Sequence, residues 1–126
     1  MPRTISPAHE IDHAGLRAML EEQRRFRLDQ LAQLHAQSGD ARTETAGRYL
    51  DPLDASADRA RTEVSEVLAA AAVQALEDID AALARMDAGR YGICDRCDAK
   101  IPPERLEAVP QARLCMSCQR RAERHR

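Results

Sequence analysis

Four cysteines near the end of the chain constrain its fold more than any other feature of the sequence. They form two Cys-x-x-Cys pairs, Cys94 with Cys97 and Cys115 with Cys118, separated by seventeen residues. Two such pairs supply the four thiolates of a tetrahedral Zn²⁺ site. Because all four ligands would be protein sulfur, no position is left for water, and we expect one structural ion. Two local disulfide or redox pairs, or an iron–sulfur cluster, are the alternatives.

The composition favours helices and excludes several classes of protein. The chain of 126 residues has 19 Lys and Arg against 21 Asp and Glu, and only five glycines and three aromatic residues. This is too little for a β-sandwich, a dinucleotide-binding core or a large ligand pocket. Since no apolar run approaches the ~20 residues of a membrane span and no secretory signal is recognisable, we expect a cytoplasmic protein with reduced cysteines.

Two long segments show apolar residues at helical spacing. The first covers residues 10 to 37, and the second begins at Asp51-Pro52 and ends at Gly89. The expected stripe of the first helix contains Leu16, Met19, Leu20, Gln23, Arg27, Leu31 and Leu34. The expected packing face of the second contains Val64, Val67, Leu68, Ala71, Ala75, Ile79, Ala82, Leu83 and Met86.

Together these patterns predict an all-α fold, in which a long antiparallel coiled-coil helical hairpin carries a small C-terminal four-cysteine zinc-finger module. The hairpin would comprise residues 1–89, with a turn over 38–50 and a tip at about 38–56. The zinc finger and a final helix from Cys115 to Arg126 would comprise residues 90–126. Zinc would then hold the base of a hairpin that has little core of its own.

The start of the second helix combines several helix-initiating residues. Asp51 suits the N-cap, Pro52 suits the first helical position, and Asp54 adds a negative charge where the helix dipole favours one. Capping alone is therefore a sufficient reason for both carboxylates.

The cysteine segment also contains a recognisable sequence pattern. It reads Tyr91-Gly92-Ile93-Cys94-x-x-Cys97, then Ile101, then the run Arg-Leu-Glu-Ala-Val-Pro-Gln-Ala over 105–112, then Cys115-x-x-Cys118. This pattern resembles the zinc-finger signature of the DksA/TraR family of bacterial transcription regulators, most densely over residues 89 to 118. One departure is Asp98, where the family usually has glycine.

The resemblance implies a function for the hairpin. In this family the hairpin enters the secondary channel of RNA polymerase, and acidic residues of an Asp-x-x-Asp-x-Ala motif at its tip act near the active site. Here Asp51 and Asp54 match the motif and Ser56 replaces its alanine, while Asp58-Arg59-Ala60 is a weaker second candidate.

The resemblance also implies a comparison with members that bind guanosine tetraphosphate through Arg and Lys on the second hairpin helix and the C-terminal helix. Residues 62 to 84 contain neither Lys nor Arg, and the corresponding surface carries Ala71, Gln74 and Asp78, with Gln119 after the last cysteine. Because phosphates need cationic donors, we predict weak or absent alarmone dependence.

We therefore expect a monomeric, non-enzymatic regulator that binds RNA polymerase and modulates initiation without sequence-specific DNA contact. Arg120, Arg121 and Arg124 would contact polymerase or phosphate, although a solvated helix end also accounts for them. The alternatives are a zinc-stabilised protein–protein adaptor and a nucleic-acid-binding zinc finger that uses the arginine-rich tail.

Overall fold

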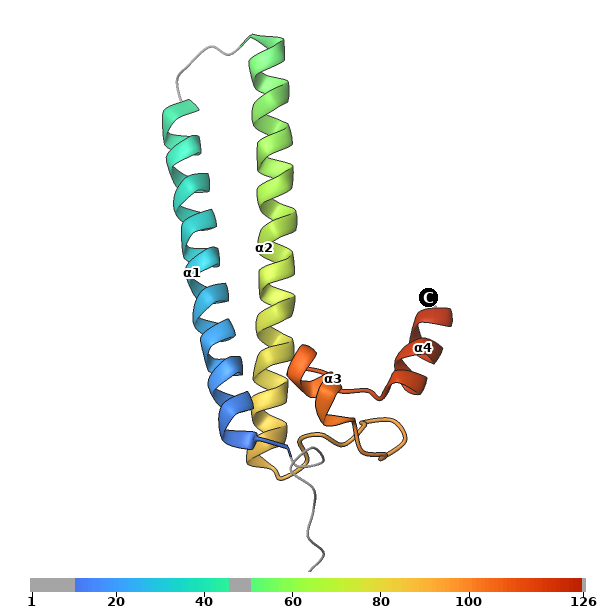
Figure 1. Cartoon of the computed structure of the whole chain (residues 1–126). Coiled ribbons are helices and arrows are strands. Elements are labelled where there is room, and N and C mark those ends of the chain that lie inside the picture. Colours follow the sequence, from blue (N-terminus) through green and yellow to red (C-terminus); the bar gives the residue numbers. More distant parts are fainter. Residues whose placement is uncertain (1–10, 46–50, 126) are drawn as a thin grey trace, which may run out of the picture. The chain divides into compact units, whose positions relative to one another are not determined.

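The described part of the chain contains four helices. The computed structural model describes residues 11–45 and 51–125, so part of the predicted tip (46–50) and the final Arg126 lie outside the described residues. The helices are α1 (His13–Thr45), α2 (Pro52–Asp87), α3 (Pro103–Ala108) and α4 (Met116–Arg124) (Figure 1). Within the described ranges, the β-pairing consists of an isolated bridge between Ile93 and Lys100. The all-α prediction is confirmed.

Helices α1 and α2 form an antiparallel hairpin with coiled-coil spacing. Their buried and half-buried residues recur at alternating intervals of four and three positions, which is the heptad spacing of a coiled-coil seam. In α1 this row contains Leu16, Leu20, Gln23, Arg27, Gln30 and Leu34. In α2 it contains Ser65, Ala69, Ala72, Leu76, Ile79, Leu83 and Met86.

Two compact units divide the described chain, and both helices contribute to each. The first unit combines the residues up to Gln23 with those from Asp78 onward, and the second comprises Arg24–Glu77. In the first unit, one apolar core joins the ends of both helices to the cysteine segment. Its buried members are Leu16, Leu20, Ile79, Ala82, Tyr91, Cys94, Ile101, Leu106, Ala112, Leu114 and Cys118.

The second unit has a thin seam, and here one part of the predicted packing face is wrong. Ala72 is buried at this seam, whereas Val64, Val67 and Leu68 are exposed. The seam follows small residues such as Ala69, because small side chains let two helices approach closely. The larger side chains at 64, 67 and 68 lie off that row and remain in solvent.

One helix boundary and one additional helix also differ from expectation. Helix α1 does not turn at residue 38 but continues through Gly39 to Thr45. A single glycine costs an α-helix only about 1 kcal/mol, and no proline occurs between Pro7 and Pro52 to break it. Helix α3 was not expected. It begins at Pro103, and proline suits a first helical position because its missing N–H needs no partner there.

No helix among the described residues is long and apolar enough to cross a membrane.

Candidate metal centre and helix tip

The first cysteine pair lies in a tight turn closed by backbone hydrogen bonds. The Cys94 N–H donates to the Ala99 carbonyl (2.8 Å), and the Asp98 N–H donates back to the Cys94 carbonyl (3.0 Å). Asp98 adopts φ +60°, in the left-handed region that favours glycine. Glycine, which the resemblance implies at this position, would adopt this conformation without steric cost.

The second cysteine pair occupies the start of α4. Cys115 is the N-cap residue, and Cys118 lies in the first turn. The backbone N–H of Cys118, in the first turn of the helix, lowers the pKa of the Cys115 thiol. The helix also fixes the spacing of the two sulfur atoms, so this pair has the geometry of a rigid half-site.

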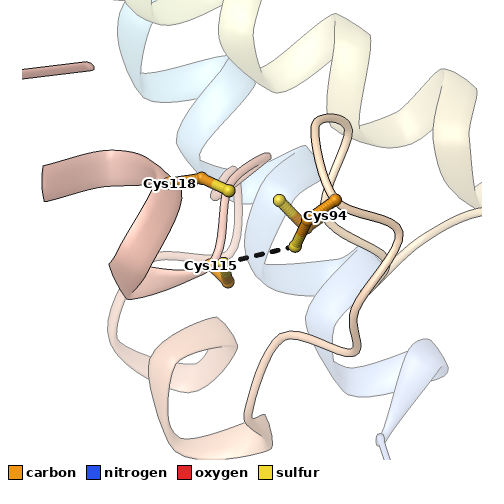
Figure 2. Close-up of side chains that lie close together, drawn as sticks. Cys94, Cys115 and Cys118 are labelled. Atoms are coloured by element: carbon orange, nitrogen blue, oxygen red, sulfur yellow. Dashed lines mark hydrogen bonds between the residues drawn. The ribbon is translucent and has the colours of Figure 1, made fainter. Parts of the chain in front are cut away.

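The four sulfur atoms converge on one point. All four Sγ atoms lie within 4.8 Å of one another, and those of Cys97 and Cys115 are 3.7 Å apart. Tetrahedral zinc with Zn–S bonds of ~2.3 Å places its sulfur ligands ~3.8 Å apart. A disulfide would require ~2.05 Å, and all four cysteines are free thiols. Figure 2 shows Cys94, Cys115 and Cys118 with their sulfur atoms turned towards one another. The residues therefore fit one tetrahedral ion.

The surroundings of the four cysteines shift the pKa values of their thiols in opposite directions. Burial disfavours the Cys94 thiolate, but the backbone N–H groups of Cys115, Cys97 and Arg96 stabilise it and lower the pKa of Cys94 to about 6. Burial and the neighbouring sulfur atoms raise the pKa of Cys118 to about 12. Without a metal the four sulfur atoms share negative charge unequally. A divalent cation removes this conflict, because it stabilises all four thiolates at once.

Two polar ties, which sequence reasoning did not identify, hold the segment between the cysteine pairs. The buried Tyr91 hydroxyl donates to the Pro110 carbonyl (2.7 Å). Arg85, in the last turn of α2, donates to the carbonyls of Gln111 and Ala112 at 3.4 Å each. These carbonyls precede Cys115, so both ties help to position the second cysteine pair. Arg85 directly follows residues 62–84 of α2, which contain no Lys or Arg. Its isolated position was the available sequence signal for this role.

The predicted tip residues lie in the second unit, at the start of α2. The Asp51 carboxylate accepts a hydrogen bond from the Asp54 N–H (2.9 Å), which is N-cap geometry. Asp51, Asp54 and Ser56 are all exposed. The cap uses one carboxylate oxygen of Asp51. Capping does not require the other Asp51 oxygen or the Asp54 carboxylate.

The arginines of α4 are exposed in the first unit. Arg120, Arg121 and Arg124 lie along this short helix, and Arg120 borders a hollow of about 350 Å³. Arg105, Arg113, Asp78 and Glu123 also line that hollow. The wall therefore mixes three guanidinium groups with two carboxylates.

Comparison with known proteins identifies the cysteine module. The family described as prokaryotic dksA/traR C4-type zinc finger matches residues 89–124. These residues contain all four converging cysteines and α4. This segment of the chain therefore matches the DksA/TraR C4-type zinc finger. The family's C4-type finger identifies the ion for which the four cysteines are positioned as zinc, so the predicted cofactor is confirmed.

Individual relatives match parts of the chain, and one of them is a DksA protein. An uncharacterized protein from Aquifex aeolicus is 40% identical over 62 residues, 49% of this chain and 43% of that protein. The RNA polymerase-binding transcription factor DksA from Haemophilus influenzae is 42% identical over 48 residues, 38% of this chain and 33% of that protein. The matched segment thus spans less than half the length of each of these relatives.

A solved structure extends the likeness beyond the DksA/TraR finger. The structure of transcription factor DksA2 from Pseudomonas aeruginosa aligns with a TM-score of 0.68 at 26% identity, covering 90% of this chain and 84% of that chain. Because this alignment includes most of α1 and α2, the likeness concerns the helical hairpin as well as the metal module.

Proposed function

We propose that this chain is a transcription regulator that binds RNA polymerase through its helical hairpin, inserted into the secondary channel. One observation carries the proposal. A DksA/TraR C4-type finger occurs in one chain with a long helical hairpin, and 90% of this chain aligns with the structure of transcription factor DksA2. The relative from H. influenzae, whose name describes it as RNA polymerase-binding, supports the choice of partner. Binding to polymerase implies a cytoplasmic protein, and the helical module and closed metal site support a non-enzymatic, monomeric role.

The start of α2 is the proposed point of action. Asp51 and Asp54 would act near the polymerase active site, where a bound divalent cation or basic side chains offer partners for carboxylates. The cap bond between Asp51 and the Asp54 N–H fixes the local geometry without neutralising either charge. Ser56, which replaces the alanine of the family motif, is exposed beside them and adds a hydroxyl to the same surface.

Promoter selectivity would follow from differential binding. A ligand shifts an equilibrium only by its preference between states, so the hairpin would change initiation by binding some promoter complexes more tightly than others. The exposed Arg120, Arg121 and Arg124 would add contacts with acidic polymerase side chains or with phosphate.

We further propose that guanosine tetraphosphate has little effect on this regulator. Two features of the described surface support this. Helix α2 has no Lys or Arg over 62–84, and Gln119 takes the first position of α4 after the last cysteine. The nearby hollow is lined by three arginines and by Asp78 and Glu123, so these side chains carry an excess of one positive charge. This excess is small for a ligand with several negative charges.

In vitro transcription tests both proposals. Purified zinc-loaded chain would be added to RNA polymerase on a ribosomal and an amino-acid-biosynthesis promoter, with and without guanosine tetraphosphate. We expect the chain to change initiation on at least one promoter, with an effect that the alarmone alters by less than about twofold, or about 0.4 kcal/mol. Strong potentiation would overturn alarmone independence. No effect on either promoter, together with no binding to polymerase, would overturn the function. Salt-sensitive retention on DNA that requires the arginine tail would favour a nucleic-acid-binding finger instead.

A further inference from the structure

The four cysteines of the metal centre are unequally exposed. The exposed fractions of Cys94 and Cys118 are 0% and 4%, whereas Cys115 is half-buried and Cys97 is exposed. The sulfur atoms of the two accessible residues, Cys97 and Cys115, are 3.7 Å apart and form one edge of the site. The centre therefore meets solvent at this edge, and the sulfur atoms of Cys94 and Cys118 lie on its inner side.

The backbone around each cysteine follows the same division. Cys94 and Cys118 are members of the apolar core of the first unit, and Cys115 packs against that core at the N-cap of α4. Cys97 instead lies within residues 95–100, all of which are exposed. The hydrogen bonds between Cys94 and Ala99 and between Asp98 and Cys94 hold the two ends of this turn. Cys97 is thus the one cysteine of the four that neither the core nor a helix holds in place.

Exposure decides which metal ligand an external reagent reaches. A sulfur atom in the core leaves the metal only when the packed side chains around it move, and such an opening costs free energy. A sulfur atom on an exposed turn leaves by a local movement. The reactivity of a cysteine towards external reagents likewise depends on its exposure. Both considerations favour Cys97 over the buried cysteines, and the fixed position of Cys115 at the start of α4 favours Cys97 over Cys115.

We infer that Cys97 is the exchangeable ligand of the metal centre, which a small external thiol displaces while Cys94, Cys115 and Cys118 retain the zinc. In this exchange the proton of the thiol passes to the Cys97 Sγ, and the thiol sulfur takes the position that Cys97 leaves. No electrons are transferred, so the exchange requires no oxidant. Thiolate is the soft type of ligand that such a sulfur site accepts. This role of Cys97 is independent of the partner that the hairpin binds.

Limited alkylation of the full zinc-loaded chain tests the order of reactivity. N-ethylmaleimide bonds a cysteine sulfur to one carbon of its double bond and a proton to the other, and peptide mass spectrometry locates the adduct. We expect Cys97 to react about ten times faster or more than Cys94 and Cys118, and also faster than Cys115. In the chain unfolded by guanidinium chloride with a chelator, the four rates should be similar. Equal rates in the folded chain, or first reaction at another cysteine, would overturn the inference.

Serine substitution tests which sulfur atoms the metal requires. Cys97→Ser and Cys94→Ser each remove one sulfur from the same Cys-x-x-Cys pair, and Cys115→Ser removes the other accessible sulfur. We expect Cys97→Ser to retain one zinc per chain after gel filtration, and to release it to the chelator 4-(2-pyridylazo)resorcinol about tenfold faster than the parent chain. Cys94→Ser and Cys115→Ser should lose most of their zinc. Loss of zinc from Cys97→Ser as complete as from either of the other variants would overturn the inference.

A small thiol tests the exchange itself. Added 2-mercaptoethanol should accelerate transfer of zinc from the parent chain to the same chelator, with a rate that rises in proportion to the thiol concentration. It should have little effect on Cys97→Ser, which has no sulfur at this position to displace. A rate in the parent chain that does not respond to the thiol would contradict the exchange. Equal acceleration in both chains would place the exchange at another ligand and would also overturn the inference.

Discussion

At the residue scale, the metal centre depends on residues that the cysteine spacing does not reveal. The four ligands were predictable because a Cys-x-x-Cys pair followed by another has few other uses in a reducing environment. The roles of Tyr91 and Arg85 were not, because both depend on carbonyls of the connecting segment. A backbone carbonyl has no sequence signature, so such a tie becomes visible only when the fold brings donor and acceptor together.

Replacement of Tyr91 tests its tie to Pro110. We expect Tyr91→Phe to lower the free energy of unfolding at pH 7 by about 1 kcal/mol, because the buried Pro110 carbonyl loses its donor. Urea unfolding of the zinc-loaded chain measures this change.

The pH dependence of stability provides a second readout of the same variant. Burial raises the pKa of Tyr91 from 10.0 to about 12, so the native state holds this proton more tightly than the unfolded state. The contribution is complete below pH ~10 and is lost as pH rises towards ~12. The slope from Tyr91 should therefore disappear in Tyr91→Phe. An alkaline slope identical to that of the parent chain would contradict this role.

Asp98 offers a test of the left-handed turn after Cys97. We expect Asp98→Gly to preserve zinc binding and raise stability by up to about 1 kcal/mol, because glycine adopts φ +60° without steric cost. The exposed ion pair with Arg90, at 3.5 Å, should subtract little from this gain. Asp98→Val should destabilise the chain, because a β-branched residue is strained in this region. Thermal unfolding compares the two variants, and equal midpoints would count against strain at this turn.

At the element scale, helix ends and helix faces differed in how well they could be predicted. The start of α2 followed from Asp51, Pro52 and Asp54, since capping is a local interaction. The continuation of α1 past Gly39 did not follow from local signals. The predicted packing face of α2 was only partly correct. In the second unit the seam follows small residues, to which predictions from hydrophobic periodicity give less weight than to valine and leucine.

The two long helices provide matched caps for separating stability from activity. Asp12 and Asp51 each accept the backbone N–H three residues later, at 3.0 and 2.9 Å. We expect Asp12→Ala and Asp51→Ala to reduce stability by a similar amount, about 1 kcal/mol each. Only Asp51→Ala should also reduce the effect on transcription.

Asparagine substitution removes the tip charges while keeping the cap, because asparagine caps helices about as well as aspartate. Asp51→Asn with Asp54→Asn should therefore abolish the transcriptional effect at nearly unchanged stability and polymerase affinity. Normal regulation by this double variant would show that the carboxylates serve only as caps.

At the scale of the whole molecule, the metal joins elements that are distant in the sequence. The core of the first unit contains Cys94 and Cys118 together with Leu16 and Leu20 of α1 and Ile79 of α2. The ends of the hairpin helices therefore share buried surface with the metal module. The division into a hairpin over 1–89 and a zinc module over 90–126 remains a prediction, and the shared core favours cooperative folding of the two parts.

Zinc removal tests this coupling. One zinc per chain should be found by metal analysis, and a strong chelator should reduce helicity and lower the midpoint of thermal unfolding. Zinc at about 1,000 times its Kd contributes about 4 kcal/mol of stability, or roughly 15 °C or more for a small domain. Restored zinc should reverse the change. A chain with the same unfolding midpoint with and without zinc would contradict a shared core.

Direct binding to polymerase is the central claim, and titration of core RNA polymerase with fluorescently labelled, zinc-loaded chain tests it most directly. We predict saturable binding at one chain per polymerase with a Kd of about 1 μM or tighter, equivalent to about −8 kcal/mol. Competition by unlabelled chain should remove the signal. An absence of saturable binding at concentrations about a hundredfold higher would contradict the claim.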